Sequence, residues 1–249
     1  MAHWWRRPLG EYKGHLMRCA PGTHEAAAEL VTRHVPREAR VLDLASGTGA
    51  FLARLRDLGY ANLSAVELNV EGFRIDGVTP RPVDLNSDFA AALGAGAFDL
   101  ITAIEIVEHL DSPRHFLRNV RALLADGGQL LLTTPNVAHW LGRVRFLLSG
   151  ELRQFQRRDY DHQRHISPIT DVQMRLMFEE IGFDVEAATT AGTFFGSAKQ
   201  AAFAPVNRIA RATMGRLATG DVSLYLVRKS GPATGSAGRD SFYFTKTGA

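Results

Sequence analysis

The chain has 249 residues, 45% of them hydrophobic, and a formal net charge of +3. This length supports one substantial core rather than two full domains, and the charge is too small to indicate nucleic-acid binding by itself. The single cysteine, Cys19, excludes an intramolecular disulfide, and no apolar run approaches the roughly 18 residues that a membrane-spanning helix needs. With no signal-peptide pattern at the start, we expect a cytoplasmic protein.

The first residues predict little regular structure. Residues 1–23 lack a periodic pattern and are typical of an irregular arm, whereas residues 24–34 have helical composition and stop before Pro36. We expect a single domain over residues 24–229, because strand and helix patterns continue to that point.

A strand pattern at residues 40–44 runs directly into a glycine turn, within the stretch VLDLASGTG at 41–49. Gly47 and Gly49 have no side chain, so a ligand can approach the backbone of this turn closely. A helical stripe of apolar residues follows at 51–58. A strand, a glycine turn and a helix in this order predict a nucleotide-binding edge.

The next strand pattern, residues 63–68, carries one acidic residue near its end. Glu67 is expected beside the glycine turn, where its carboxylate can accept two hydrogen bonds from a ribose diol. The pair of features therefore predicts an adenosine-type ligand. A dinucleotide is disfavoured, because the GxGxxG loop of dehydrogenases needs glycine where this chain has Leu52.

Strands and helices continue to alternate up to residue 135. The expected elements are a short strand ending at Asp84, a buried strand at 99–107, a helix starting at Pro113 with Ser112 as its cap, and a strand at 129–135. Regular alternation of this kind predicts an α/β fold with a doubly wound, mostly parallel sheet and helices on both faces.

The second half of the chain is less regular. Its expected elements are a lid-like region at 136–166, a helix with Ser167 as cap and Pro168 as first residue, a strand at 183–189, an inserted amphipathic region at 194–220, a strand at 221–229 and a disordered tail at 230–249.

The motifs, taken in order, resemble those of a known family. VLDLASGTG, Glu67, Asp84, FDLITAIEIVEHLDSP and LLADGGQLLLTTPN are similar to the class I S-adenosylmethionine-dependent methyltransferases, especially the branch of ubiquinone-type and small-molecule O-methyltransferases. The resemblance implies a Rossmann-like sheet of seven strands whose last strand is antiparallel. It also implies S-adenosylmethionine as the methyl donor.

The resemblance further implies which residues hold the donor. The first turn binds the methionine end, Glu67 binds the ribose, Asp84 binds the adenine, and the end of the fourth strand faces the sulfonium. The residues so assigned are Asp43, Ala45, Gly47, Gly49, Glu67, Leu68, Asp84, Leu85, Ile104 and Glu105. Ala45 departs from the family, which usually has glycine there, and its methyl group is costly if φ is positive.

The sequence EIVEH, residues 105–109, is expected at the rim where the methyl group lies. Small-RNA 3′-terminal 2′-O-methyltransferases carry a similar ExxEH pattern with a distant histidine, and they bind a divalent cation. By that resemblance Glu105, Glu108, His109 and His162 form a site for Mg²⁺ or Mn²⁺ that polarises an acceptor hydroxyl. The alternatives left open are a solvated Glu108 and a His109 that packs against, or caps, the following helix.

A general base is the simpler hypothesis for the proton of the acceptor. His162 or His165 accepts it directly, and Glu105 completes the candidate catalytic residues. The two histidines are three residues apart in an expected loop, so only one of them needs to face the donor. His162 matches the family position better.

The acceptor is the least defined part of the prediction. We expect O-methylation of a small-molecule or glycan acceptor, with an anionic group if the arginines near His162 bind it. These arginines are Arg143, Arg145, Arg153, Arg157, Arg158 and Arg164. A solvated basic face explains them equally well, and without an aromatic and basic platform nucleic acid is not expected.

Three broader alternatives stay open. The chain is also compatible with a non-catalytic subunit that binds S-adenosylmethionine, and the ExxEH pattern alone leaves an RNA-end 2′-O-methyltransferase possible. The amphipathic residues 194–220 are typical of a lid or of a homodimer face, and less often of a peripheral membrane contact.

Overall fold

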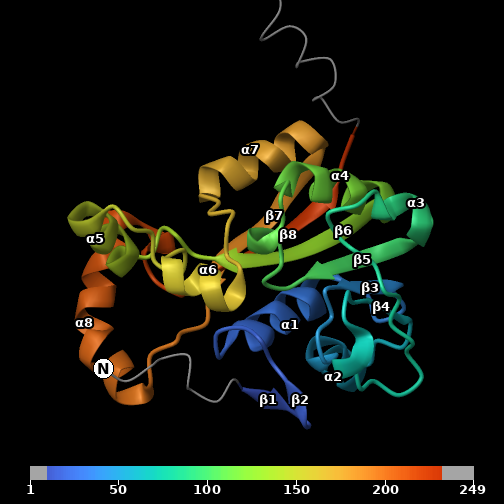
Figure 1. Cartoon of the computed structure of the whole chain (residues 1–249), viewed down its shortest axis with the longest axis horizontal. Helices are drawn as coiled ribbons and strands as arrows, with labels where there is room; N and C mark the ends of the chain where they lie inside the picture. The colour runs from blue at the N-terminus through green and yellow to red at the C-terminus, as the bar shows by residue number, and fades with distance from the viewer. Residues whose placement is uncertain (1–9, 232–249) are drawn as a thin grey trace, which may run out of the picture.

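The structure is a computed structural model, and it describes residues 10–231 (Figure 1). Residues 1–9 of the expected arm and 232–249 of the expected tail lie outside the described residues. The elements in chain order are β1 (Glu11–Tyr12), β2 (His15–Leu16), α1 (Thr23–His34), β3 (Val41–Leu44), α2 (Ala50–Asp57), β4 (Leu63–Val66), η2 (Val70–Gly72), α3 (Phe89–Leu93), β5 (Phe98–Ala103), η3 (Val107–His109), α4 (Pro113–Leu123), β6 (Leu124–Pro135), α5 (Trp140–Ser149), α6 (Arg157–Gln163), α7 (Asp171–Ile181), β7 (Phe183–Ala191), α8 (Ser197–Met214), η4 (Arg216–Ala218) and β8 (Val222–Lys229).

A six-stranded sheet in the order β4-β3-β5-β6-β8-β7 forms the centre of the molecule. The strands β4, β3, β5 and β6 are parallel, and β8 is antiparallel to both β6 and β7. The α/β, Rossmann-like class and the antiparallel last strand are therefore confirmed. Because β3 to β6 run in the same direction, their carboxyl ends meet at one edge of the sheet.

The expected count of seven strands is wrong by one. The short strand expected before Asp84 is reduced to a single parallel bridge between Val66 and Arg81. Arg81 donates its amide to the Ala65 carbonyl and accepts from the Glu67 amide, so both of its backbone groups face β4. Pro80 and Pro82 flank it, and their missing amide protons are on the side away from β4, as is typical of an edge position. The bridge still brings the segment that follows Arg81 next to the end of β4.

Helices cover both faces of the sheet, as expected for a doubly wound fold (Figure 1). On one face, Phe51 of α2 and Val31 of α1 share a buried cluster with Leu131 of β6. On the other face, Phe116 of α4 and Phe178 of α7 pack with alternate residues of the same strands, such as Leu130. Alternation of this kind buries both sides of the central strands.

The helix expected after Ser167 begins later than its sequence suggests. Thr170 is the N-cap of α7, and it forms a capping box with Gln173. Ser167 has a different role, because its hydroxyl donates to the Leu110 carbonyl and its amide donates to the Glu108 carbonyl. The Ser167-Pro168 segment is thereby fastened to the loop after β5.

The two irregular regions of the sequence contain helices. The segment 136–166 holds α5 and α6, and the amphipathic segment 194–220 holds α8 and η4. Both lie at one end of the sheet, and α5 and α8 are beside each other there (Figure 1). Within residues 10–231, every helix is too short or too polar to cross a membrane.

Candidate active site

The turn after β3 has the backbone of a tight ligand-binding loop. Ala45, Gly47 and Gly49 all have positive φ, at 57°, 55° and 88°. A Cβ atom at Gly49 would lie 2.3 Å from Cγ1 of Ile75, whereas one at Gly47 would meet nothing within 4 Å. Gly49 is therefore required for packing, while Gly47 leaves open space above the turn.

Ala45 occupies the left-handed region that glycine usually fills. We expect Ala45→Gly to stabilise the protein by about 0.5–1 kcal/mol, because the left-handed cost for an L-residue, roughly 1–2 kcal/mol, exceeds the unfolded-state entropy that glycine adds. The measurement is urea unfolding at neutral pH. The matched control is Ala122→Gly on the exposed side of α4, which should lose about 0.5–1 kcal/mol. Equal losses for both variants would show that Ala45 is unstrained.

Asp43 is buried at the end of β3 and is 3% exposed. Its Oδ1 atom accepts a hydrogen bond of 2.6 Å from the Thr102 hydroxyl of β5. Burial raises the pKa of Asp43 to about 7, and the neighbouring Glu67 carboxylate adds to the shift. Asp43 thus ties the end of β3, where the turn begins, to the neighbouring strand β5.

Glu67 reaches from the end of β4 to the glycine turn. The Gly47 amide donates to its Oε2 atom at 2.7 Å, and the Asn69 amide donates to Oε1 at 3.2 Å. The side chain is only partly exposed. These bonds fix the carboxylate beside the open space over Gly47, which is where the sequence placed a ribose-binding acid.

The other donor-site residues occupy varied positions. Asp84 is exposed, and its Oδ1 atom accepts a bond of 2.9 Å from the Asn86 amide. Leu85 is buried in the core, and Leu68 is 68% exposed. Ile104 packs beside Cys19. The assignment of these residues to the donor stays a prediction.

Glu105 is held by the end of β6. Its amide donates to the Thr133 hydroxyl at 2.9 Å, and that hydroxyl donates to Glu105 Oε1 at 3.0 Å. The backbone has φ of 50°, which turns the chain sharply after β5. Burial raises the pKa of Glu105 to about 8, and the Asp221 carboxylate adds to this effect.

Glu108, His109 and His165 form a cluster of ligand-capable groups next to Glu105. Within residues 10–231, one atom from each of the three lies within 4.8 Å of the other two. The Thr134 hydroxyl donates to Glu108 Oε2 at 3.1 Å, whereas the buried Oε1 has no hydrogen-bond partner among the described residues. The His109 and His165 rings meet edge to face, with centroids 4.8 Å apart.

The protonation of this cluster follows from its burial. Glu108 is fully buried, which raises its pKa well above the usual range, and Glu105 raises it further. Burial lowers the pKa of His109 to about 4, with His165 contributing, and burial also lowers the pKa of His165. Both imidazoles are therefore neutral at pH 7 and keep one nitrogen lone pair each.

The tautomer of His165 is set by a neighbouring backbone group. Its Nδ1 lies 2.8 Å from the Gln154 carbonyl oxygen, which can only accept, so Nδ1 carries the proton. The lone pair is then on Nε2. Gln154 itself is 7% exposed and has φ of 69°.

His162 does not join this cluster. It lies on the exposed side of α6, which ends at Gln163, and Arg164 follows with φ of 61°. This left-handed residue turns the chain so that His165, at 8% exposure, points into the molecule. Of the four metal ligands expected from the sequence, Glu108 and His109 are in the cluster and Glu105 is adjacent, whereas the third member of the cluster is His165 and not His162.

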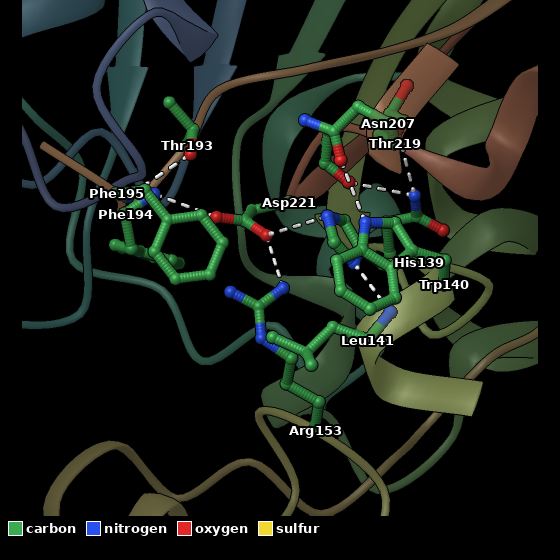
Figure 2. Close-up of polar contacts among 12 residues, drawn as sticks. His139, Trp140, Leu141, Arg153, Thr193, Phe194, Phe195, Asn207, Thr219 and Asp221 are labelled. Atoms are coloured by element: carbon green, nitrogen blue, oxygen red, sulfur yellow. Dashed lines mark hydrogen bonds and ion pairs between the residues drawn. The ribbon is translucent and has the colours of Figure 1, made fainter. Parts of the chain in front are cut away.

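Asp221 joins the lid-like region to the sheet (Figure 2). Its carboxylate is 1% exposed and pairs through Oδ1 with Arg153, while Oδ2 accepts a bond of 2.7 Å from the Phe194 amide. His139 Nε2 is 3.8 Å from the same Oδ1. The Gln154 side chain donates to the Asp221 carbonyl at 3.0 Å, so a chain of contacts runs from Asp221 through Gln154 to His165.

The sequence profile of a family described as a methyltransferase domain matches residues 15–188, which is more than half of the chain. The chain belongs to this methyltransferase family. With its Rossmann-like sheet, it is a class I S-adenosylmethionine-dependent methyltransferase, and the expected enzyme class and methyl donor are confirmed at this level.

Curated relatives of this methyltransferase include ubiquinone biosynthesis O-methyltransferases. The protein from Xanthomonas axonopodis pv. citri is 32% identical over 108 residues, which cover 41% of this chain and 45% of that protein. The protein from Cupriavidus pinatubonensis is 24% identical over 179 residues, covering 68% of this chain and 69% of that protein. The chain thus spans less than half the length of the Xanthomonas relative.

Solved structures with the same fold include two other S-adenosylmethionine-dependent methyltransferases. The Mesorhizobium loti structure has a TM-score of 0.58 and 16% identity, and it covers 82% of this methyltransferase and 99% of its own chain. The Archaeoglobus fulgidus structure has a TM-score of 0.55 and 16% identity, and the match covers 83% of this chain and 95% of that one. These similarities show the fold.

Several residues around the site of this methyltransferase were not identified from the sequence. They are Thr102, Thr133, Thr134, Gln154 and Asp221. The threonines lie within apolar strand patterns, where a hydroxyl gives no sign of its partner. Asp221 has a weak signal, because it is a lone acid immediately before a strongly apolar strand.

Proposed function

We propose that this methyltransferase transfers a methyl group from S-adenosylmethionine to a hydroxyl oxygen of a small-molecule or glycan acceptor. The observation that carries the proposal is the cluster of Glu108, His109 and His165 beside Glu105, because a hydroxyl must lose its proton and these groups can take or displace it. The O-methyltransferase names of the curated relatives support transfer to oxygen.

The donor supplies an activated methyl group on a sulfonium, so the protein has mainly to align the reactants. In this proposal Glu67 accepts hydrogen bonds from the ribose hydroxyls, and the Gly47 amide keeps its carboxylate in position. The open space over Gly47 admits the ligand. Glu105, just past β5, borders the reacting end.

His165 is the proposed proton acceptor. Its Nδ1 proton is fixed on the Gln154 carbonyl, so Nε2 carries the lone pair. Because the imidazole is neutral at pH 7, it can accept the acceptor's proton as methyl transfer proceeds. Gln154 then stabilises the resulting imidazolium through the bond at Nδ1.

The same residues fit a divalent cation, which is the alternative to a histidine base because the one lone pair of His165 cannot bind a cation and a proton together. Glu108 has a buried oxygen without a partner among the described residues, and two neutral imidazoles stand within reach of it. Glu108, His109 and His165 would hold the ion, and this mixed oxygen and nitrogen set suits Mn²⁺ better than Mg²⁺. A divalent cation supplies a Lewis acid that makes a hydroxyl more acidic.

The arginines near the site are largely engaged with acidic neighbours. Arg145 pairs with Glu151, Arg153 with Asp221, Arg157 with Asp161 and Arg158 with Asp159. We therefore base the acceptor proposal on its hydroxyl and not on a phosphate or carboxylate group.

The donor part of the proposal is tested at Glu67. We expect Glu67→Gln to weaken binding of S-adenosylhomocysteine by about 10–100-fold, because charge-assisted hydrogen bonds are worth roughly 1.5–3 kcal/mol. Isothermal titration calorimetry measures the Kd. The control is Glu71→Gln, which makes the same charge change on the exposed turn η2 and should leave the Kd unchanged.

Equal affinity of the two variants would contradict the assignment of Glu67. Transfer to oxygen is read by NMR of the product formed with an isotope-labelled methyl group. A labelled carbon attached to nitrogen or carbon would overturn the O-methylation proposal. Tight donor binding with no transfer to any hydroxyl compound would favour a non-catalytic subunit.

A further inference from the structure

The end of α5 exposes three consecutive large apolar side chains. Phe146, Leu147 and Leu148 are 52%, 83% and 80% exposed. Successive residues of an α-helix are turned by about 100°, so the three cover roughly 200° of its circumference. A surface helix that docks on a protein presents an apolar stripe of about 100° instead.

The helix α8 extends this apolar surface. Trp140 at the start of α5 donates to Asn207 of α8 at 2.8 Å, and its ring lies 5.8 Å from that of Phe203. These contacts pack the two helices together at one end of the molecule (Figure 1). On α8, Val206 and Ile209 are 39% and 64% exposed.

The charges of the two helices all have one sign. Together α5 and α8 contain Arg143, Arg145, Lys199, Arg208 and Arg211, and they contain no Asp or Glu. Each of these five residues is exposed. Arg145 pairs with Glu151 just beyond α5, which leaves a strong positive excess on the pair. A helix pair that is both apolar at its tip and basic along its length is typical of a membrane-surface element.

We infer that α5 and α8 bind the surface of a membrane that contains anionic phospholipid. When the end of α5 enters the apolar layer of a membrane, the acyl chains surround it and contact the whole arc, roughly 200°, of exposed apolar side chains. The arginines stay at the surface and contact the lipid phosphates. A second copy of this chain fits less well, because it would bring two basic helix pairs together.

The proposed membrane-binding surface of α5 and α8 is close to the candidate active site. The helix α5 begins shortly after β6, and the end of β6 carries Thr133 and Thr134, which bind Glu105 and Glu108. A bound membrane would therefore lie near the end of β6 that holds Glu105 and Glu108.

The test is co-sedimentation of the full chain with vesicles. We expect binding to phosphatidylcholine vesicles that contain phosphatidylglycerol. The affinity for pure phosphatidylcholine vesicles should be lower by about tenfold or more. Leu147→Ser with Leu148→Ser should weaken binding by about tenfold or more, as should Arg208→Glu with Arg211→Glu. The matched control is Val172→Ser with Leu176→Ser on α7, whose side chains are 66% and 56% exposed; it should bind as the unmodified protein does.

Thermal unfolding and binding of S-adenosylhomocysteine show whether each variant is folded, and neither measurement depends on the identity of the methyl acceptor. Absence of binding to the anionic vesicles overturns the inference. Equal loss in the α5 and α7 variants also overturns it. A concentration-dependent dimer that only the Leu147 and Leu148 substitutions dissociate would assign this surface to a second copy instead, and would likewise overturn it.

Discussion

Replacing Asp221 by asparagine is expected to lower the free energy of unfolding by about 3–5 kcal/mol, because it breaks a buried ion pair and leaves the Arg153 charge without a partner. Both oxygens of Asp221 accept hydrogen bonds, from Arg153 and from the Phe194 amide. Asparagine has only one accepting oxygen, so one donor must lose its bond. Urea unfolding at neutral pH measures the change.

The control for Asp221 lies in the same region of the chain. Glu151→Gln breaks the Arg145–Glu151 pair, whose side chains are 43% and 51% exposed, and such a pair contributes about 1 kcal/mol or less. Removing both buried charges, with Asp221→Asn and Arg153→Met together, should recover part of the loss. If Asp221→Asn were as mild as Glu151→Gln, the contact with Arg153 would not hold the lid-like region in place.

The second large effect is expected at His165. Replacing it with alanine should lower the rate of methyl transfer by about 10²–10⁴-fold, since it removes the one lone pair that serves either as proton acceptor or as cation ligand. Glu108→Gln should weaken Mn²⁺ binding, because it removes the only carboxylate of the cluster. Turnover and calorimetric titration of Mn²⁺ measure the two quantities.

The control for His165 is the nearby His162→Ala. Its side chain is exposed on α6 and outside the cluster, so turnover should stay within about twofold of the unmodified enzyme. Equal losses for the two histidine variants would contradict the assignment. Activity that survives exhaustive chelation, with no gain on adding Mg²⁺ or Mn²⁺, would remove the cation from the proposal and leave the base.

Local sequence predicted the parts of the fold that depend on local rules. The strand, glycine turn and helix at residues 41–57 follow from apolar periodicity and from the positive φ of Gly47 and Gly49. The expected seventh strand is reduced to a single bridge at Arg81, between Pro80 and Pro82. The two prolines exclude a strand that pairs on both sides, but they leave an edge strand possible, so its loss could not be predicted from them.

The candidate site was harder to predict, because it depends on distant contacts. Sequence spacing alone cannot tell which of His162 and His165 points inward, since that is decided by the left-handed Arg164. Ser167 has the sequence of a helix cap, but the Leu110 carbonyl competes successfully for its hydroxyl. Asp221 is 68 residues from Arg153, so no local pattern could show their pairing.

The most direct test of the account is a crystal structure of the full chain with S-adenosylhomocysteine and Mn²⁺, with anomalous data collected at the manganese edge. The account predicts ribose hydroxyls on the Glu67 carboxylate and an anomalous peak at ligand distance from Glu108, His109 and His165. A ligand whose ribose lies away from Glu67, together with no peak at that cluster, would contradict it.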